Sequence, residues 1–405
     1  MNYRQTLEYI DELSLRGSVL GLDNMVRILD KLDNPQQNLK FIHVAGTNGK
    51  GSVCRYISAM LIKAGYKTGV YTSPSVFEYL EKIRVGNRNI SQKSYAECMS
   101  RIKECAIENS IEITSFEAET AAAFLYFYEV GCDIVVLETG MGGISDATNV
   151  VDTTVMSIIT SISMDHYGVL GRSVLEIAQK KAGIIKAGAV VVSAPGVDDA
   201  INVINSKASE LGCRIIISNG DEASGYKLMM QGEYQRINAS VAICAARALK
   251  ELGYNISDEI IRYVLENITL DGRFEIISKK PLFIIDGAHN VAAAKYLRET
   301  LINKYSDKKK LFIIGVFADK DYEGIIQNTV DLAEHVITVA TKDSSRALPA
   351  YELAKAVSAY NKNVSNADSI EEALEIAKLL KPEMIVAFGS LSYLGYLKKL
   401  VRNKK

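Results

Sequence analysis

Residues 41–52 read FIHVAGTNGKGS, and this stretch decides the fold. The apolar run at 41–45 predicts a short buried strand, and the following VCRYISAMLIKAG repeats apolar residues at helical spacing. A strand, a glycine-rich turn and a helix in this order place backbone N–H groups around an anion. The stretch therefore predicts a site for nucleotide phosphates, in which Lys50 reaches the terminal phosphates. Its residues are Gly46, Thr47, Asn48, Gly49, Lys50, Gly51 and Ser52.

The spacing of this loop departs from the common G-x-x-x-x-G-K-[ST] pattern. Gly51 follows the lysine directly, and Ser52 comes one place later. The alternative is an ordinary glycine turn between a strand and a helix. Such a turn has no need of a lysine and a serine together, so the phosphate site is the favoured interpretation.

Similar apolar runs recur along the chain between longer helical patterns. Short buried strands that alternate with helices predict an α/β fold with a mostly parallel sheet. The runs lie at residues 41–44, 134–137, 155–159, 190–192, 283–285, 311–314 and 384–386. The pattern weakens at LDGRFEIISKKP, residues 270–281, and a new series starts at Phe283. We therefore expect a domain boundary near residue 275, with domains at 1–275 and 276–405.

Composition argues against several classes of protein and kinds of site. The chain has 405 residues with 47 basic and 48 acidic side chains, and the net charge of −1 argues against a dedicated nucleic-acid or membrane-surface binder. The six cysteines form no C-x-x-C pair, which argues against a zinc site or a disulfide framework and favours buried, reduced thiols. The N-terminus lacks the apolar core of a signal peptide and no segment offers about 18 uninterrupted apolar residues, so we expect a cytoplasmic protein.

Many further motifs accompany the loop in a fixed order. The chain resembles the folylpolyglutamate synthase and dihydrofolate synthase group of the Mur ligase superfamily. The matching motifs are LGLD at 20–23, NP at 34–35, YTSP at 71–74, ETGMGG at 138–143, DATN at 146–149, MDH at 164–166, EIA at 176–178, KAGI at 181–184, Gln235, Asn238, GRFE at 272–275, DGAHN at 286–290 and ADKD at 318–321. Chance agreement at so many ordered positions is negligible.

The resemblance implies an architecture and an activity. The architecture is a P-loop, mostly parallel-sheet ATPase domain that binds ATP and folate, followed by a smaller Rossmann-like α/β C-terminal domain that serves as the glutamate ligase domain. The activity is an ATP- and Mg²⁺-dependent ligation of L-glutamate to the γ-carboxylate of reduced folates through an acyl phosphate. Joining dihydropteroate to glutamate is implied as a second activity. The expected partners are these small molecules alone, and the chain is expected to be a monomer.

Two residues follow strands at the expected ligand-binding edge of the sheet. Glu138 ends IVVLE, and His166 follows VMSIITSISMD. From the residues alone, Glu138 also suits a cap or the surface, and a lone histidine is more often structural. The resemblance implies two Mg²⁺ ions, with Asp165 orienting the imidazole of His166. The implied metal ligands are Ser52, Ser73, Glu138, His166 and Lys181.

Lys181 lies on a predicted helix with Lys180 and Lys186 nearby. By pattern alone these are three solvated lysines. The resemblance implies instead that Lys181 is carbamylated by carbon dioxide and serves catalysis as a metal-binding carboxylate, because an ammonium group would repel magnesium.

Four later residues complete the implied ATP and catalytic sites. The resemblance implies an adenine contact for Asn238, although hydrogen bonding at the start of a helix is the plain alternative. It implies that Arg273 reaches the ATP phosphates, that Asp286 binds a ribose hydroxyl, and that His289 lies beside the metal–nucleotide site or the incoming glutamate. The two domains would then close over ATP and exclude water from the acyl phosphate.

The folate pocket is implied by position within the motifs. Phe116 suits the hydrophobic core equally well, and Arg84 and Arg88 offer local positive charge, although exposed loop arginines are common. The implied substrate residues are Gly21, Leu22, Asp23, Phe116, Glu117, Ser145, Asp146 and Ala147. The chain departs from the family where Ile144 replaces a frequent arginine and Ser75 a frequent histidine, which bears on substrate choice and turnover.

Several alternatives stay open at this point. If the chain is not a folylpolyglutamate synthase, the alternatives are a dihydrofolate synthase without that activity or another Mur-type amide ligase. A cell-wall ligase is disfavoured because 45 residues before Gly46 are too few for that group's extra domain. A nucleotide-binding switch without ligase chemistry is the remote option. A dehydrogenase is weaker still, because GMGG at 140–143 lacks the G-x-G-x-x-G spacing.

Overall fold

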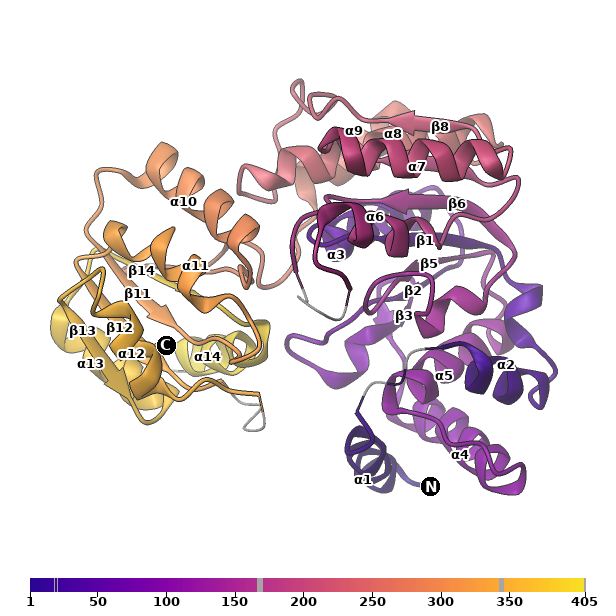
Figure 1. Ribbon diagram of the computed structural model, residues 1–405, viewed down its shortest axis with the longest axis horizontal. Coiled ribbons are helices and arrows are strands. Elements are labelled where there is room, and N and C mark those ends of the chain that lie inside the picture. Colours follow the sequence, from indigo (N-terminus) through magenta and orange to yellow (C-terminus); the bar gives the residue numbers. More distant parts are fainter. Residues whose placement is uncertain (18, 20, 166–169, 342–345, 404–405) are drawn as a thin grey trace. The chain divides into compact units, whose positions relative to one another are not determined.

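The computed structural model describes residues 1–405 except 18, 20, 166–169, 342–345 and 404–405 (Figure 1). It forms two compact units. The first unit comprises Met1–Lys227 and Arg236–Ile268, and the second comprises Leu228–Gln235 and Thr269–Lys405. Each unit has its own sheet and its own apolar core, as the α/β pattern of the sequence predicts.

Within the described residues, the first unit contains an eight-stranded sheet in the order β4-β3-β2-β5-β1-β6-β7-β8. Six strands run parallel, and only the edge strands β3 and β4 run antiparallel to their neighbours. The strands are β1 (Phe41–Ala45), β2 (Thr68–Tyr71), β3 (Ile83–Val85), β4 (Arg88–Asn89), β5 (Ile134–Glu138), β6 (Thr154–Ile159), β7 (Val190–Ser193) and β8 (Ile215–Ile217). The apolar runs predicted as strands at 41–44, 134–137, 155–159 and 190–192 are confirmed.

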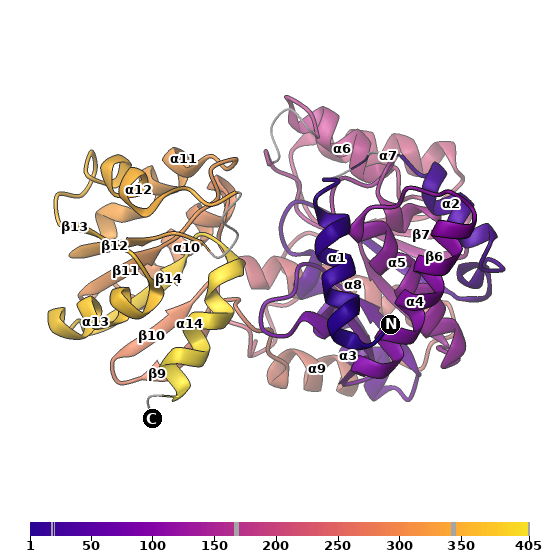
Figure 2. The same cartoon turned by 90° about the horizontal axis from the view of Figure 1, so that it is seen from below.

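Helices lie on both faces of this sheet, as parallel strands require. Helix α3 packs on β1, β2 and β5, while α5 packs on β2 and carries α1, α2 and α4, which gather beside it in Figures 1 and 2. The helices are α1 (Tyr3–Ser14), α2 (Asp23–Asp30), α3 (Lys50–Lys63), α4 (Gln92–Glu108), α5 (Ser115–Glu129), α6 (Val174–Ala182), α7 (Asp198–Glu210), α8 (Tyr234–Glu251) and α9 (Asp258–Asn267), with 3₁₀ turns η1 (Pro35–Asn38), η2 (Tyr79–Lys82) and η3 (Ala147–Val150).

The largest core of the first unit lies between the sheet and α5. Phe41 of β1 meets Phe124 of α5 edge to face, with ring centroids 5.5 Å apart. Side chains alternate along a strand, so His43 points from β1 toward the same face as Phe41. All six cysteines are free; five are buried and Cys213 is half-buried, which confirms the prediction of reduced, mostly buried thiols.

The second unit contains, in its described part, a six-stranded sheet in the order β13-β12-β11-β14-β10-β9, in which only β9 runs antiparallel. Its strands are β9 (Glu275–Lys279), β10 (Leu282–Ile285), β11 (Lys310–Ile314), β12 (His335–Val339), β13 (Val364–Ala367) and β14 (Met384–Phe388). Its helices are α10 (Val291–Tyr305), α11 (Tyr322–Gln327), α12 (Ala350–Val357), α13 (Ile370–Leu380) and α14 (Leu391–Asn403), with the 3₁₀ turn η4 (Val330–Leu332). The smaller C-terminal α/β domain expected from the sequence is confirmed.

The main segment of the second unit begins at Thr269, whereas the sequence predicts a domain boundary near residue 275. Ion pairs explain why the connecting segment joins the second unit. The buried Lys398 of α14 lies 2.8 Å from Asp271 Oδ1 and 2.6 Å from Glu275 Oε1. Glu275 Oε2 also accepts a hydrogen bond from the Gly272 N–H at 3.0 Å. The polar side chains that make this segment resemble a loose linker therefore form the ion pairs that hold it against α14.

A search of the described residues finds no helix with both the length and the apolar character needed to cross a bilayer.

Candidate active site

The predicted phosphate loop joins β1 to α3 and approaches its neighbours too closely for side chains. A Cβ atom on Gly46 would lie 1.7 Å from Thr160 Oγ1, and one on Gly49 would lie 2.2 Å from Asn238 Oδ1. Gly49 also has a φ of +91°, in the left-handed region that favours glycine. Helix α3 begins at Lys50, so the N–H groups of its first turn are available at the loop.

The segment after β6 holds the loop in place. Thr160 Oγ1 and Ser161 Oγ donate hydrogen bonds to the carbonyl of Asn48 at 2.8 and 3.1 Å. The Thr47 N–H donates to Ser161 O at 2.7 Å, and Thr47 Oγ1 donates to Ser163 O at 3.0 Å. The loop is therefore preorganised by the protein itself, which lowers the entropic cost of binding a phosphate group.

Two lysines converge on one carbonyl oxygen of this loop. Lys50 Nζ lies 3.1 Å from Gly46 O, and Lys181 Nζ lies 2.6 Å from the same oxygen. Lys181 comes from α6 and is only 3% exposed, so the alternative that it is a solvated lysine is wrong. Burial, and secondly the charge of Lys50, lower the pKa of Lys181 to about 7, while Asp165 and Asp146 oppose this shift.

Glu138 brings a carboxylate to the loop from the end of β5. The side chain is 4% exposed, and its Oε2 accepts a hydrogen bond from the Ser73 N–H at 3.4 Å. The same oxygen would lie 3.6 Å from a Cβ on Gly51, and the adjacent Ser52 is buried in the first turn of α3. The structure thus brings together the loop, Ser73 and Glu138, three of the predicted contributors to a metal site.

The donor set fits Mg²⁺. A carboxylate and hydroxyl oxygens are hard ligands, and Mg²⁺ binds through few protein groups when phosphate oxygens and waters complete its shell. In the described part of the chain no group of three or more His, Cys, Asp or Glu side chains is placed to hold a metal ion. The predicted ligand His166 lies outside the described residues.

Asn238 stands beside the phosphate loop. It is buried on α8, and its amide oxygen faces Gly49. The structure therefore places Asn238 beside the predicted phosphate loop, and its contact with adenine stays a prediction.

The predicted residues of the second unit gather around Gly287. Arg273 donates to Gly287 O at 3.5 Å, and His289 Nδ1 lies 2.8 Å from the same oxygen. Asp286 is buried and accepts hydrogen bonds from Tyr234 Oη at 2.7 Å, from Phe274 N at 2.8 Å and from Ala288 N at 2.9 Å. Burial raises the pKa of the Asp286 carboxyl. Both carboxylate oxygens of Asp286 therefore accept hydrogen bonds from groups of this chain. The predicted contact with the ribose stays a prediction.

The predicted folate residues lie on connected elements of the first unit. The half-buried ring of Phe116 lies against Gly140, where a Cβ would be 2.5 Å from the ring, and its centroid is 6.1 Å from that of Tyr71. Asp146 and Ala147 are buried in the segment after β5, and Ser145 is half-buried. Helix α2, which starts at the exposed Asp23 after half-buried Gly21 and Leu22, packs against α5 and η3.

Glu117 has a structural role in this arrangement. Its Oε2 accepts hydrogen bonds from the N–H of Thr114 at 2.7 Å and from Thr114 Oγ1 at 2.9 Å, which closes a capping box at the start of α5. A substrate contact of this buried carboxylate stays a prediction.

Comparison with known proteins decides the family. The Mur ligase middle domain matches residues 44–244, and the Mur ligase glutamate ligase domain matches residues 272–391. The dihydrofolate synthase/folylpolyglutamate synthase of Bacillus subtilis (strain 168) is 34% identical over 411 residues, which cover 94% of this chain and 95% of the relative. The chain belongs to the folylpolyglutamate synthase and dihydrofolate synthase family of Mur ligases. It is therefore an ADP-forming ligase.

Solved structures support the same fold. FolC from Escherichia coli in complex with DHPP and ADP superposes with a TM-score of 0.90 at 26% identity and covers 100% of this chain and 98% of its own. The bifunctional folylpolyglutamate synthase/dihydrofolate synthase from Yersinia pestis, complexed with AMPPNP and Mn ion, gives a TM-score of 0.87 at 27% identity, covering 99% and 98%. The Mur ligase architecture expected from the sequence is confirmed.

Three residues that position the site in this ligase were missed by sequence reasoning. Tyr234 holds Asp286, and Lys398 holds the segment around Arg273. His43 contacts Thr148 from inside the first unit. Tyr234 precedes Gln235 directly and His43 precedes the phosphate loop by three residues, so proximity to motifs was the available signal. Nothing in the local sequence of Lys398 distinguishes it from the solvated Lys399.

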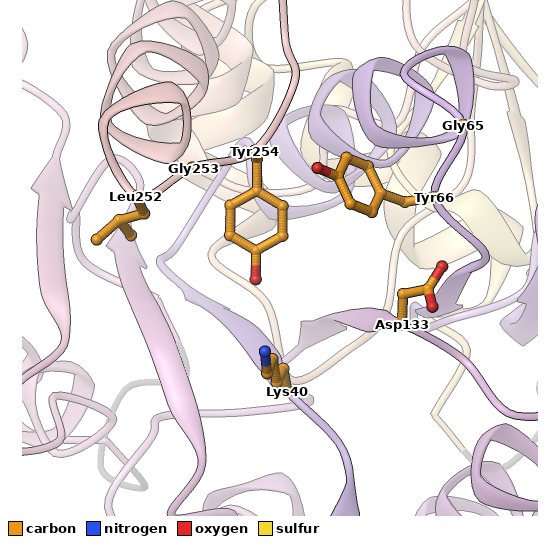
Figure 3. Close-up of a pocket in the computed structure, with 7 residues that line it drawn as sticks. All are labelled: Lys40, Gly65, Tyr66, Asp133, Leu252, Gly253 and Tyr254. Atoms are coloured by element: carbon orange, nitrogen blue, oxygen red, sulfur yellow. The ribbon is translucent and has the colours of Figure 1, made fainter.

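A separate hollow of about 550 Å³ lies at the amino ends of β1, β2 and β5 in the first unit (Figure 3). Its lining residues are Lys40, Gly65, Tyr66, Asp133, Leu252, Gly253 and Tyr254. The rings of Tyr66 and Tyr254 stand 5.3 Å apart between centroids, and Tyr66 Oη accepts a hydrogen bond from Asn255 N. No predicted site residue lines this hollow. It is at the opposite edge of the sheet from the phosphate loop.

Replacing Lys398 with methionine is expected to destabilise the second unit by about 2–3 kcal/mol. Removing the partner of a buried ion pair costs about 3–5 kcal/mol, and the half-exposed Asp271 recovers part of this by hydration. Calorimetry should show a lowered melting midpoint for Lys398→Met. The matched control is Lys399→Met at the next, exposed position, with an expected change within about 0.5 kcal/mol. Equal midpoints for the two variants would contradict the fastening role of Lys398.

Proposed function

We propose that this chain catalyses the ATP-dependent addition of L-glutamate to the γ-carboxylate of a reduced folate, and that it also joins dihydropteroate to glutamate. The observation that carries the proposal is the convergence of Lys50 and Lys181 on the carbonyl of Gly46, with Glu138 and Ser73 beside the same loop. Positive groups, helix N–H groups and a carboxylate in one place suit phosphoryl transfer from a metal nucleotide. The complexes of relatives with DHPP, ADP, AMPPNP and Mn support the substrate class.

The first step converts an unreactive carboxylate into an acyl phosphate. An oxygen of the folate carboxylate attacks the γ-phosphorus of ATP, the bond to the bridging oxygen breaks, and ADP leaves with that electron pair. Lys50 and the first-turn N–H groups of α3 stabilise the charge on the phosphate oxygens. Mg²⁺ held through Ser52, Ser73, Glu138 and the proposed ligand His166 would neutralise these oxygens further.

The second step forms the amide bond. The uncharged amine of glutamate attacks the acyl carbon, and inorganic phosphate leaves with the electron pair of the carbon–oxygen bond and takes up the proton that the new amide nitrogen loses. His289 is suited to take the proton lost by the glutamate ammonium group. The Gly287 carbonyl only accepts, so Nδ1 of the neutral imidazole carries the proton and Nε2 is the basic nitrogen. Arg273, held at the same carbonyl, is proposed to bind the nucleotide phosphates.

We also propose that Lys181 is carbamylated. Carbon dioxide reacts only with an uncharged amine, and a pKa of about 7 leaves a large uncharged fraction at neutral pH. The Nζ lone pair attacks the carbon of CO₂ and one proton leaves, which yields an N-carboxylate. Carbamylation replaces a cation next to Lys50 with an anion. The anion would attract both the ammonium group of Lys50 and a nearby metal ion. We propose two metal ions, as the family resemblance implies, and the carbamate would supply a ligand to one of them.

The function is tested by incubating the protein with MgATP, L-glutamate and either tetrahydrofolate or dihydropteroate. We expect release of ADP and phosphate that requires both glutamate and the pterin acid, together with a product heavier by one glutamyl unit. ADP formation with only one acid would identify a single activity. ATP binding without substrate-dependent hydrolysis for any pterin acid would refute the proposal and favour a nucleotide switch. The cytoplasmic location and the monomeric state stay predictions.

Depleting carbon dioxide is expected to lower turnover by at least about tenfold, because the ligand set of the metal loses an anion. The enzyme is dialysed at pH 6 in bicarbonate-free buffer, then assayed at pH 8 with and without added bicarbonate. Bicarbonate should restore activity, and ¹³C-bicarbonate should give a carbamate NMR signal that is absent in Lys181→Met and present in Lys180→Met. Full activity with an unmodified Lys181 would contradict carbamylation.

A further inference from the structure

A buried chain of hydrogen bonds joins β1 to the segment that carries the proposed folate residues Ser145, Asp146 and Ala147. His43 Nε2 lies 2.8 Å from Thr148 Oγ1, and Thr148 Oγ1 donates to Asp146 Oδ1 at 2.6 Å. His43 and Thr148 are 0% exposed and Asp146 is 6% exposed. A buried polar chain of this kind is rigid, because every unmade hydrogen bond in it costs about 1–3 kcal/mol.

The direction of the protons along this chain is fixed by the available donors. Thr148 has one hydroxyl proton, and it points to the carboxylate of Asp146. The hydroxyl oxygen must therefore accept from His43, which makes His43 the tautomer protonated at Nε2. Within the described residues His43 Nδ1 has no hydrogen-bond partner. Burial, and secondly the charge of Lys186, lower the pKa of His43 to about 3, so the ring is neutral at physiological pH.

Asp146 in turn organises the segment at residues 140–148. Its Oδ2 accepts a hydrogen bond from Met141 N at 2.7 Å, and its Oδ1 accepts from Thr148 N at 3.1 Å. This segment follows Glu138 and Thr139 at the end of β5 and contains Ser145, Asp146 and Ala147, which are proposed to contact the folate. The carboxylate is thereby held in one orientation by both ends of the segment.

His43 also belongs to the strand that leads into the phosphate loop. It occupies the third position of β1, and Gly46 follows the end of that strand. A displacement of Asp146 relative to β1 would therefore displace the acyl substrate relative to the phosphate that it attacks. Reactions of this type are sensitive to such displacements, since about 1 Å of misplacement can cost 10²-fold in rate.

We propose that His43 is a positioning residue for the acyl substrate, which fixes Asp146 through Thr148 and so aligns the folate carboxylate with the phosphate loop. The inference rests on the proposed contact between Asp146 and the acyl substrate. His43 itself touches neither ATP nor folate. Its loss therefore acts on the placement of the pterin acid, and so on turnover with that substrate, and leaves the binding of ATP unchanged.

Two variants of His43 separate the hydrogen bond from the packing. His43→Phe keeps a planar ring and removes the donor, whereas His43→Gln places an amide N–H near the position of Nε2. For His43→Phe we expect kcat/KM for tetrahydrofolate and dihydropteroate to fall about 10–50-fold, mainly through kcat, with the KM for ATP within about twofold of the wild type. His43→Gln should recover most of this loss. A Phe variant with an unchanged kcat/KM for the pterin acids, or with an equal loss in kcat/KM that comes from a raised KM for ATP, would overturn the inference.

Thr148 supplies an independent test in case His43→Phe does not fold. Thr148→Val removes the relay and Thr148→Ser retains it, so only the valine variant should lower kcat/KM for the pterin acids. Long-range ¹H–¹⁵N NMR of the imidazole should show Nε2 protonated and Nδ1 unprotonated from pH 5 to 8; a proton on Nδ1 would contradict the relay. These outcomes are distinct from failure of the proposed function, in which the wild type itself forms no product with either pterin acid.

Discussion

Replacing Lys50 with methionine is expected to lower kcat/KM for the ATP-dependent ligation by about 10²–10³-fold. Methionine keeps much of the length of the side chain and removes the charge beside Gly46. The transferring phosphoryl group then loses a cation in a site that the protein holds rigid, so the loss should appear mainly in kcat. Steady-state kinetics with varied ATP and a saturating pterin acid measure it.

The matched control for this variant is Lys63→Met at the other end of the same helix. Lys63 Nζ lies over the ring of Tyr263 at 3.7 Å, away from the loop, and the expected change in kcat is less than twofold. Lys50 also contributes to the lowered pKa of Lys181, so both variants should be assayed at pH 7.5 and at pH 9. A deficit of Lys50→Met that disappears at pH 9 would show that Lys50 acts only through Lys181, and would contradict its role at the phosphates.

Replacing Lys181 with methionine is expected to abolish most activity and to change how stability depends on pH. The activity should fall by about 10²-fold or more, since the site loses the proposed metal-binding carboxylate. In bicarbonate-free buffer, the wild type should gain about 1.5 kcal/mol of unfolding free energy between pH 7 and 8.5. The methionine variant should lack this gain.

The sign of the pH effect follows from the lowered pKa. Between about 7, the pKa of Lys181 in the folded protein, and 10.5, its ordinary value, the unfolded chain binds more protons than the folded chain. The free energy of unfolding therefore rises with pH across that window. Urea titrations at several pH values measure the slope, with Lys180→Met as the control that keeps it. The same slope in Lys181→Met and the wild type would show that another group titrates.

The alternation of apolar runs with helical patterns predicted both sheets, because parallel strands buried on two faces must be apolar throughout. The order of glycines and lysine at 46–52 predicted the phosphate loop, because backbone approach and anion binding need those residues in that order. The motifs predicted the family, and the family resemblance implied that Glu138 and Ser73 are metal ligands. Each of these predictions depends only on the residues within short segments of the chain.

Only the tertiary structure decided how lysines, histidine and carboxylates behave. Lys181 and Lys180 are neighbours in sequence, yet only packing of α6 against the loop puts Lys181 out of water and next to Lys50. The fastening of residues 271–275 depends on Lys398, more than a hundred positions away, and the relay from His43 to Asp146 spans a similar separation. Charge, proton position and pKa depend on the solvent and partners around a group, and those are set by residues that meet only when the chain has folded.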